Sequence, residues 1–319
     1  MRYLIVGGAG FIGSHLVRRV LPSAEQVTVY DNFSSGRDWH LEDIADNPIL
    51  RVVAANVRDL DTLTGAMTGH DVVFHFASNP DIARAATEPD IDFWEGTYLT
   101  QNVLEAMRRS GVKHILYASG SGVYGETGLR EVAENHAPML PISTYGASKL
   151  GCEALLCAYG HMFGIVGRAF RFANVVGPRQ THGVAYDFIR RLREYPRHLR
   201  ILGDGRQSKS YIHVDDVLDA MLLVHKLGGE GFDVFNVATT DYITVREIAD
   251  LVADRLGLAN VEYAFSGGDR GWKGDVPVVR FNTAKIRQRG WTNQRTSHQA
   301  MADAVAAMIV DAQSGKLYQ

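Results

Sequence analysis

Short apolar runs alternate with longer amphipathic stretches along the first half of the chain. The runs are rich in β-branched and aromatic residues, and they occupy residues 3–6, 27–30, 50–54, 72–76, 115–119 and 166–172. Helix-length segments separate most of these runs. Strands that alternate with helices in this way form a parallel sheet covered on both faces. The pattern therefore predicts an α/β fold with a doubly wound parallel sheet.

The pattern changes after about Asn174. The elements expected beyond it are a strand at 211–214 after a glycine turn at 203–205, a helix that begins near Asp215 or Asp216, a further strand of the first sheet at 232–237, and helices at 245–256 and 297–312. We therefore expect one domain of residues 1–173 plus about 215–238. A smaller C-terminal α/β domain would take about 174–214 plus 239–319.

A glycine-spaced turn follows the first apolar run directly. Gly7 allows a sharp turn at the strand end, Gly10 removes a side chain where a pyrophosphate must approach, and Gly13 allows close packing of helix on strand. The amides at the start of the following helix then face the phosphates. This order of elements predicts a dinucleotide site.

Asp31 ends the second apolar run, at the distance from the glycines where a carboxylate accepts hydrogen bonds from the adenosine ribose. A phosphorylated ribose would be repelled there, so we expect NAD as the cofactor. Arg37 lies downstream and would favour the phosphorylated form. The choice of NAD over NADP therefore depends on Asp31.

Tyr145 and Lys149 stand four residues apart at the start of a helix-like segment, so both side chains project from one face. The ordinary pKa of a tyrosine, near 10, is too high for a base at neutral pH. A neighbouring ammonium group and a nicotinamide cation would lower the pKa of Tyr145. The pair is therefore a candidate for proton removal from a hydroxyl that is oxidised by NAD.

Composition excludes several classes of partner. The chain has 319 residues, with 33 basic and 36 acidic side chains, and no basic block interleaved with aromatics. We therefore expect no nucleic-acid partner. No apolar stretch approaches the roughly 20 residues of a spanning helix, and the first residues form a strand instead of a signal peptide. We expect a cytoplasmic enzyme with no membrane partner.

Cysteine and histidine spacing gives no metal site. Cys152 and Cys157 lie five apart, which does not place them on one helix face, and we expect both in the core. His75 sits in an apolar strand, as a core histidine would. The histidines lack the spacing of metal ligands, and we propose no metal.

Seven motifs occur in the order found in one enzyme family. They are 7–13 (Gly-Gly-Ala-Gly-Phe-Ile-Gly), Asp31-Asn32, 75–78 (His-Phe-Ala-Ser), 123–125 (Val-Tyr-Gly), Tyr145-x-x-x-Lys149, 171–178 (Arg-Phe-Ala-Asn-Val-Val-Gly-Pro), and 203–216 with its Tyr-Ile-His-Val-Asp-Asp end. Over essentially its whole length the chain resembles the extended short-chain dehydrogenase/reductases of the nucleotide-sugar epimerase and dehydratase family.

The resemblance implies a Rossmann-type NAD-binding domain, a nucleotide-sugar-binding domain and tightly held NAD that is recycled within each turnover. Tyr145 would take the proton of the sugar C4 hydroxyl, and the 4-keto sugar would turn and be reduced on its other face. Lys149 would also hold the nicotinamide ribose.

The family's binding residues map onto this sequence by motif. Those implied for NAD are Gly7, Gly10, Phe11, Ile12, Gly13, Asp31, Asn32, Ser35, Gly36, Asn56, Val57, Phe76, Ala77, Ser78, Tyr145, Lys149 and Phe172. Those implied for the nucleotide sugar are Asn79, Ser121, Tyr145, Asn174, Val184, Phe188, Lys209, Arg270 and Asp275. Lys209, with Arg270, would pair with the phosphates, although Lys209 stands where the family more often has arginine. A lysine offers a point charge instead of the arginine fork.

Three positions depart from the family pattern. The hydroxyl residue expected four positions before the tyrosine of Val-Tyr-Gly is Gly120. Ser119 and Ser121 flank it, and we slightly favour Ser119 as the catalytic hydroxyl; alternatively Tyr145 acts without one, or Tyr124 or a water replaces it. A common asparagine is Gly96, and the acid expected near the adenine is Asn56, whose amide also bonds adenine.

The loop around Gly120 helps choose among the family's reactions. Dehydratases carry an Asp-Glu pair where this chain has Ser121 and Gly122, and decarboxylating relatives carry a glutamate in the loop. The catalysts of elimination are therefore missing. Epimerisation at C4 is the leading interpretation, followed by net reduction of a 4-keto sugar, and by a catalytically silent NAD-binding regulator.

The substrate's identity rests on less evidence. A UDP-hexose is favoured, and another base or a heptose stays open. Val279 stands roughly where a tyrosine limits access to larger sugars in some relatives. The segment 181–188 would contact the nucleobase. The segment 267–274 resembles a mobile flap, in which Trp272 either packs against the sugar or only packs within the loop. We expect a homodimer, and Leu99, Val103 and Met107 would lie on its helix stripe or in the core.

Overall fold

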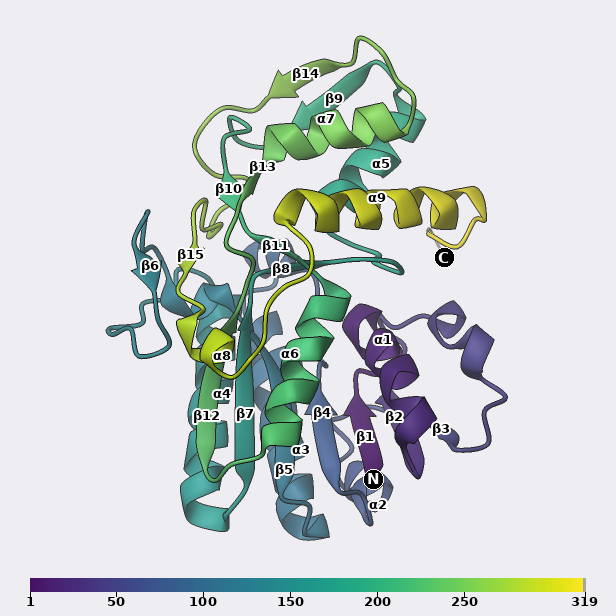
Figure 1. Ribbon diagram of the computed structural model, residues 1–319, viewed down its shortest axis with the longest axis vertical. Coiled ribbons are helices and arrows are strands. Elements are labelled where there is room, and N and C mark those ends of the chain that lie inside the picture. Colours follow the sequence, from purple (N-terminus) through teal and green to yellow (C-terminus); the bar gives the residue numbers. More distant parts are fainter. Residues whose placement is uncertain (318–319) are drawn as a thin grey trace. The chain divides into compact units, whose positions relative to one another are not determined.

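The computed structural model describes residues 1–317 and divides into two compact units (Figure 1). The first unit comprises Met1–Val123, Thr144–Arg171 and Met221–Phe235, and the second comprises Tyr124–Ser143, Phe172–Ala220 and the remainder from Asn236. The second unit thus takes 124–143, which the sequence predicts in the nucleotide-binding domain. The reason is a pairing between residues distant in the sequence, because β6 (Glu131–Val132) of that segment pairs with β15 (Arg280–Phe281).

The first unit is built on a seven-stranded sheet in the order β12-β7-β5-β4-β1-β2-β3. Its strands run parallel, and their bounds are β1 Arg2–Val6, β2 Gln26–Asp31, β3 Leu50–Ala54, β4 Val72–His75, β5 His114–Gly120, β7 Val166–Phe172 and β12 Phe232–Val237. All four residues of β4 are buried, as expected of a strand covered on both faces. The expected sheet and its strands are confirmed, with ends that differ by one residue.

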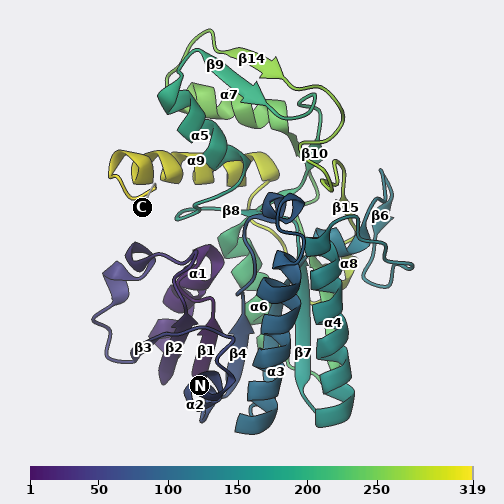
Figure 2. The same cartoon turned by 180° about the vertical axis from the view of Figure 1, so that it is seen from behind.

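Helices cover both faces of this sheet. In Figure 1, α1 (Phe11–Val20) and α6 (Val214–Leu227) cross in front of it, and Figure 2 shows α3 (Tyr98–Ser110) and α4 (Thr144–Phe163) on the other face, where α2 (Leu60–Met67) packs on α3. Short 3₁₀ turns lie at Leu21–Ser23, Asp38–His40, Glu42–Ile44, Ile82–Ala86 and Ser121–Tyr124, and a π-helical turn, Phe93–Thr97, precedes α3. Leu99, Val103 and Met107 of α3 are buried in the core.

The second unit is a small α/β assembly with its own apolar core. Its helices are α5 Val184–Glu194, α7 Val245–Arg255, α8 Ala284–Gln288 and α9 Ser297–Gln313, and α5, α7 and α9 pack on one another. The remaining strands are β8 Asn174–Val176, β9 His198–Ile201, β10 Ser208–Lys209, β11 Tyr211–His213, β13 Ile243–Thr244 and β14 Glu262–Phe265, which pair two by two. Helices α7 and α9 and strand β11 occur where the sequence predicts them.

Candidate active site

The glycine turn after β1 is crowded by backbone on every side. Gly7 has a φ of +81°, and a Cβ there would lie 2.7 Å from the backbone nitrogen of Ala77. A Cβ on Gly13 would overlap the carbonyl oxygen of Gly7. Gly10 caps α1 without a side-chain hydrogen bond, and the first turn of α1 carries no acidic residue. The helix start therefore presents backbone amides that fit an anionic pyrophosphate.

The structure brings Asp31 to this turn. Its Oδ2 accepts a hydrogen bond from the Ala9 amide at 2.9 Å, and its Oδ1 accepts one from the Phe33 amide at 2.8 Å. Asp31 is 8% exposed, and burial raises the pKa of its carboxyl. The Arg37 amide donates a hydrogen bond to the Ala9 carbonyl, and Arg37 Nη1 donates one to the Gly36 carbonyl. Asp31 and Arg37, the two residues that bear on the choice of NAD or NADP, therefore both lie at the glycine turn.

The other residues expected around NAD follow the ends of the parallel strands. Asn56 lies after β3, where its Oδ1 accepts the Arg58 amide and its carbonyl accepts the Tyr30 hydroxyl. Phe76 and Ala77 lie after β4 and donate their amides to the Val6 carbonyl. These strand ends meet at one edge of the sheet, where open α/β sheets bind their ligands. The residues present therefore fit a dinucleotide.

Tyr145 and Lys149 lie on one face of the first turns of α4. The Lys149 Nζ is 5.4 Å from the centre of the Tyr145 ring and 4.9 Å from that of Tyr117, and it donates to the Ala118 carbonyl at 2.8 Å. Lys149 is 3% exposed, and burial lowers its pKa to about 8. In the protein alone, burial and then the charge of Asp92 raise the pKa of Tyr145, so the expected lowering would have to come from the bound nicotinamide cation. Desolvation of the phenolate outweighs the nearby ammonium group.

The loop after β5 places its two serines differently. Ser119 is 4% exposed, and its hydroxyl donates to Glu153 Oε1 at 2.6 Å, which weighs against Ser119 as the catalytic hydroxyl. Ser121 is half-buried and begins the 3₁₀ turn. A Cβ on Gly120 would lie 4.0 Å from Cε1 of Tyr145, so this glycine faces the tyrosine. The Tyr124 hydroxyl donates a hydrogen bond to Asn236 Oδ1 at 2.7 Å.

Glu153 extends the face of α4 that carries Tyr145 and Lys149. Its carboxylate accepts two hydrogen bonds from Arg171, at 3.0 Å from Nε and 2.6 Å from Nη2. Both side chains of the ion pair are at most 5% exposed. Ser119, Glu153 and Arg171 therefore join the ends of β5 and β7 to α4, a connection that the sequence did not predict.

The Gly96 departure has a steric explanation. A Cβ on Gly96 would overlap Oγ of Ser148, which accepts a hydrogen bond from Thr97 Oγ1 at 3.0 Å.

Cys152 and His75 are buried as expected, and His75 Nε2 bonds Thr100 Oγ1 at 3.0 Å. Cys157 is only partly buried, so the prediction of two core cysteines is half right.

The residues expected to hold the phosphates belong to the second unit and are paired with carboxylates. Lys209 Nζ lies 2.6 Å from Asp275 Oδ1, and Arg270 pairs with Glu126. Asp275 also accepts the Gly271 amide at 3.0 Å. A diphosphate would compete with these carboxylates for the two cations.

The other expected sugar-nucleotide residues differ in what they offer. Asn174 is exposed, and its Nδ2 donates to the Ser210 carbonyl at 3.4 Å. Val184 is half-buried, whereas Phe188 is 3% exposed within the core, so its ring is not open to a ligand. Asn79 donates to Asp92 and to the Asp81 carbonyl and accepts the Asp81 amide, which leaves its amide group little capacity for a sugar.

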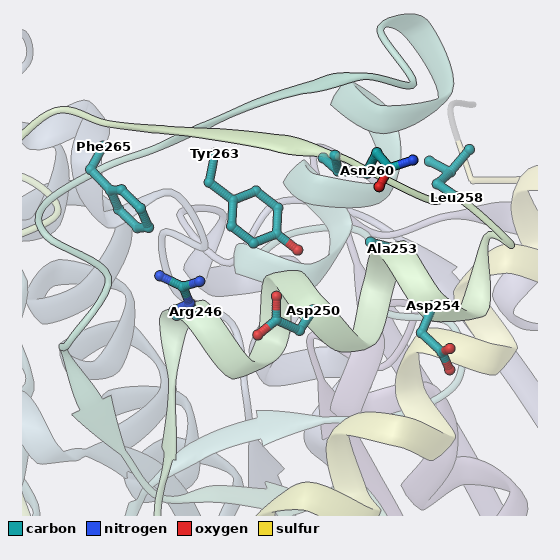
Figure 3. Close-up of a pocket in the computed structure, with 9 residues that line it drawn as sticks. Arg246, Asp250, Ala253, Asp254, Leu258, Asn260, Tyr263 and Phe265 are labelled. Carbon is teal, nitrogen blue, oxygen red and sulfur yellow. The ribbon is translucent and has the colours of Figure 1, made fainter.

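A separate groove of about 520 Å³ lies in the second unit between α7 and β14 (Figure 3). Figure 3 shows the Tyr263 hydroxyl above Asp250 and the Arg246 guanidinium between the Tyr263 and Phe265 rings. Burial and a hydrogen bond to Asp250 raise the pKa of Tyr263. None of the groove's lining residues is among those expected to bind NAD or substrate.

The glycine turn, Asp31 and the Tyr145–Lys149 pair are the features expected of an NAD-dependent enzyme that acts on a hydroxyl. The model of the NAD dependent epimerase/dehydratase family matches residues 3–238, and the chain belongs to this family. It is therefore an NAD-dependent nucleotide-sugar enzyme. In the described residues, no helix has both the length and the apolar character needed to span a membrane.

The relatives of this chain include 4-epimerases and 4,6-dehydratases. The UDP-glucose 4-epimerase of Mycolicibacterium smegmatis is 34% identical over 97% of this chain and 97% of its own. A crystal structure of a UDP-galactose 4-epimerase is 37% identical, with a TM-score of 0.87 over 98% of this chain and 99% of that one. A dTDP-glucose 4,6-dehydratase from Streptomyces venezuelae, solved with NAD bound, is 28% identical with a TM-score of 0.90 over 98% of both chains.

Proposed function

We propose that this protein is a nucleotide-sugar 4-epimerase that inverts C4 of an NDP-sugar, with a UDP-hexose as its substrate. The observation that carries the proposal is the placement of Tyr145 and Lys149 on one face of α4, near residues 119–122, which include no acid. The similarity to UDP-glucose 4-epimerases supports the same reaction.

The protein's own contribution is proton transfer and positioning. Tyr145 removes the O4 proton as the C4–H bond breaks, which leaves a 4-keto sugar, and it returns the proton when the opposite face is reduced. Bound NAD would supply the hydride-transfer chemistry at C4. Lys149, held by the Ala118 carbonyl, stabilises the phenolate. The Gly7–Gly13 turn and Asp31 hold the dinucleotide.

The loop after β5 favours epimerisation over dehydration. Elimination of water needs an acid and a base, and residues 119–122 are Ser-Gly-Ser-Gly. A Cβ on Gly122 would lie 3.2 Å from Cα of Gly146, so a glutamate at this position would require the start of α4 to shift by a few tenths of an ångström. We propose Ser121 as the hydroxyl that assists Tyr145, because the Ser119 hydroxyl is bonded to Glu153.

Residues of the second unit would hold the nucleotide diphosphate. Lys209 and Arg270 would supply the charge once the diphosphate replaces their carboxylate partners, and Asn174 would supply a polar contact. Asp275, which now pairs with Lys209, is carried over from the family on resemblance alone. Val279, which is 5% exposed, would admit larger sugars than a tyrosine would. The remaining residues carried over from the family, including Val184 and Phe172, are proposed on resemblance alone.

One observation favours a second candidate function. The missing side chain at Gly120, opposite Tyr145, is what a catalytically silent NAD-binding regulator would tolerate. A net oxidoreductase acting on a 4-keto sugar is the other alternative, and it would change the absorbance of the nicotinamide ring during the reaction. A recycling epimerase leaves this absorbance unchanged at equilibrium.

We also propose a homodimer formed through α4. The outward face of this helix is apolar and made of small residues, with Ala147, Ala154, Ala158 and Met162 exposed. Light scattering of the purified protein tests this proposal. Ala154→Glu should give a monomer if the face pairs two subunits.

The direct test of the function is incubation of the purified protein with nucleotide sugars that differ in base and sugar, without added cofactor. Proton NMR then follows the stereochemistry at C4. Interconversion to equilibrium of one pair supports the epimerase and names its substrate. An unchanged panel, with NAD still bound, would contradict it.

A further inference from the structure

Asp92 is a buried acid to which the account above gives no role. It directly precedes the π-helical turn Phe93–Thr97 and is 2% exposed. A carboxylate is rarely buried to this degree unless an opposite charge or a set of donors compensates it. The partners of Asp92 therefore bear on why an acid stands at this position.

Both carboxylate oxygens are held by neutral donors from distant parts of the chain. Asn79 Nδ2, after β4, donates to Oδ1 at 2.9 Å. Thr144 Oγ1, at the first residue of α4, donates to Oδ2 at 2.7 Å. Asp92 thus ties the loop after β4 to the start of α4, one residue before Tyr145.

The charge of Asp92 also acts on the residues of the proposed chemistry. The groups that face Tyr145 are Asp92 and, on α4, Cys152 and Lys149, with Tyr117 on β5. Asp92 raises the pKa of both Tyr145 and Lys149, and Glu153 acts on Lys149 in the same direction. Because neither donor to Asp92 is charged, its field at Tyr145 is not cancelled by its own partners.

We propose that Asp92 is a positioning residue for Tyr145. Asp92 holds the start of α4 in place and keeps the Tyr145 phenol protonated until a positive charge is bound beside it. This proposal rests on the proposed role of Tyr145 as the base. It explains why an acid is buried where an uncharged amide would accept from Asn79 and donate to the Thr144 hydroxyl at lower cost. Ionisation of Tyr145 would then be coupled to the oxidised, positively charged nicotinamide.

The test is the titration of Tyr145 itself, in protein as purified with its cofactor. Tyrosine labelled with ¹³C at Cζ reports each phenol by NMR, and the resonance missing from Tyr145→Phe identifies Tyr145. Asp92→Asn keeps the shape and removes the charge, so its Tyr145 midpoint should fall by at least about one pH unit, a tenfold rise in phenolate at a given pH below the midpoint.

Thr144→Val is the matched control, because it removes the hydrogen bond from Thr144 to Asp92 and leaves the charge of Asp92 in place. Its Tyr145 midpoint should stay within about half a pH unit of wild type, while kcat falls. Asp92→Glu restores the charge and should restore the wild-type midpoint. If Asp92→Asn does not fold, a wild-type midpoint that rises after chemical reduction of the bound nicotinamide supports the same coupling.

An unchanged midpoint in folded Asp92→Asn, or no rise on reduction of the nicotinamide, would overturn the proposal. Neither measurement needs a substrate. Failure of the 4-epimerase proposal would appear instead as an inactive wild type whose Tyr145 still titrates as described, so the two failures are distinguishable.

Discussion

The Nζ of Lys149 lies 5.4 Å from the ring centre of Tyr145 and is fixed by a hydrogen bond to the Ala118 carbonyl. This geometry places a buried cation one helical turn from the proposed base. It also anchors the cation to the strand end that carries the Ser-Gly-Ser-Gly loop. The relationship makes Tyr145 the first residue to test.

Tyr145→Phe removes the ionisable hydroxyl with little change of shape. We expect turnover to fall by at least about a hundredfold, the usual scale for a lost general base. Bound NAD, measured by absorbance after denaturation, should stay at the wild-type level. Turnover within a few-fold of wild type would assign the proton transfer to another group.

Ser121→Ala and Ser119→Ala separate catalysis from structure. Ser121→Ala should lower kcat about tenfold with an unchanged unfolding midpoint, because it removes a hydroxyl that assists the base. Ser119→Ala should leave kcat nearly unchanged and cost about 1–3 kcal/mol of stability, because Glu153 loses a buried donor.

Gly120→Ser offers a rescue in the Ser121→Ala background. A Cβ at 120 would meet only Cε1 of Tyr145, at 4.0 Å, so the position can take a side chain beside the base. We expect kcat of the double variant to return toward wild type. If instead Ser119→Ala carries the larger loss in kcat, Ser119 is the hydroxyl partner.

Glu153→Gln leaves the buried guanidinium of Arg171 without its carboxylate. Removing one member of a buried ion pair costs about 3–5 kcal/mol, and we expect a loss of this size in urea unfolding. Glu105→Gln is the control, because Glu105 pairs with Arg108 and Arg109 on the surface, where such pairs contribute less than about 1 kcal/mol. Equal losses in the two variants would contradict the buried network.

Lys149 should make stability depend on pH in one direction. Burial lowers its pKa from 10.5 to about 8, so between these values the unfolded chain holds a proton that the folded protein has lost. The free energy of unfolding, relative to the uncharged Lys149→Met variant, should therefore rise with pH across this window. Urea unfolding of both proteins at about pH 7.5 and about pH 9.5 measures this change. A difference in unfolding free energy between wild type and Lys149→Met that stays flat or falls would show that burial does not lower the pKa of Lys149.

Val279→Tyr tests the size of the sugar pocket. The larger ring should reduce activity on bulky substrates before small ones, because it narrows the space that valine leaves open. Values of kcat/KM for two sugars of different size measure the effect. Equal losses on both would show that Val279 does not select the sugar.

The sequence predicted the parts of this protein whose signal is local. The parallel strands read as continuous apolar runs because both faces are buried, and Gly7 and Gly13 stand where backbone leaves no room for a Cβ. Strands such as β10 and β13 were missed because two residues carry no periodicity. The Ser119–Glu153 and Asp92–Thr144 bonds join residues far apart in the chain, and no spacing rule indicates them.

The pKa of Tyr145 is raised in the protein alone because burial is a property of the folded chain, and its lowering with the nicotinamide cation bound stays a prediction. The four-residue spacing to Lys149 is visible in the sequence, and the desolvation that outweighs it is not. The same holds for Phe188, whose place in a core only the packing of α5 shows.

The central claim is inversion at C4 by internal return of the same hydride. A nucleotide sugar that is interconverted in the NMR panel, deuterated at C4, would be incubated in ordinary water without added cofactor. We predict an epimer with inverted C4 that keeps its deuterium, because the hydride never meets solvent. Loss of deuterium to water, or accumulation of reduced nicotinamide in proportion to product, would contradict the account.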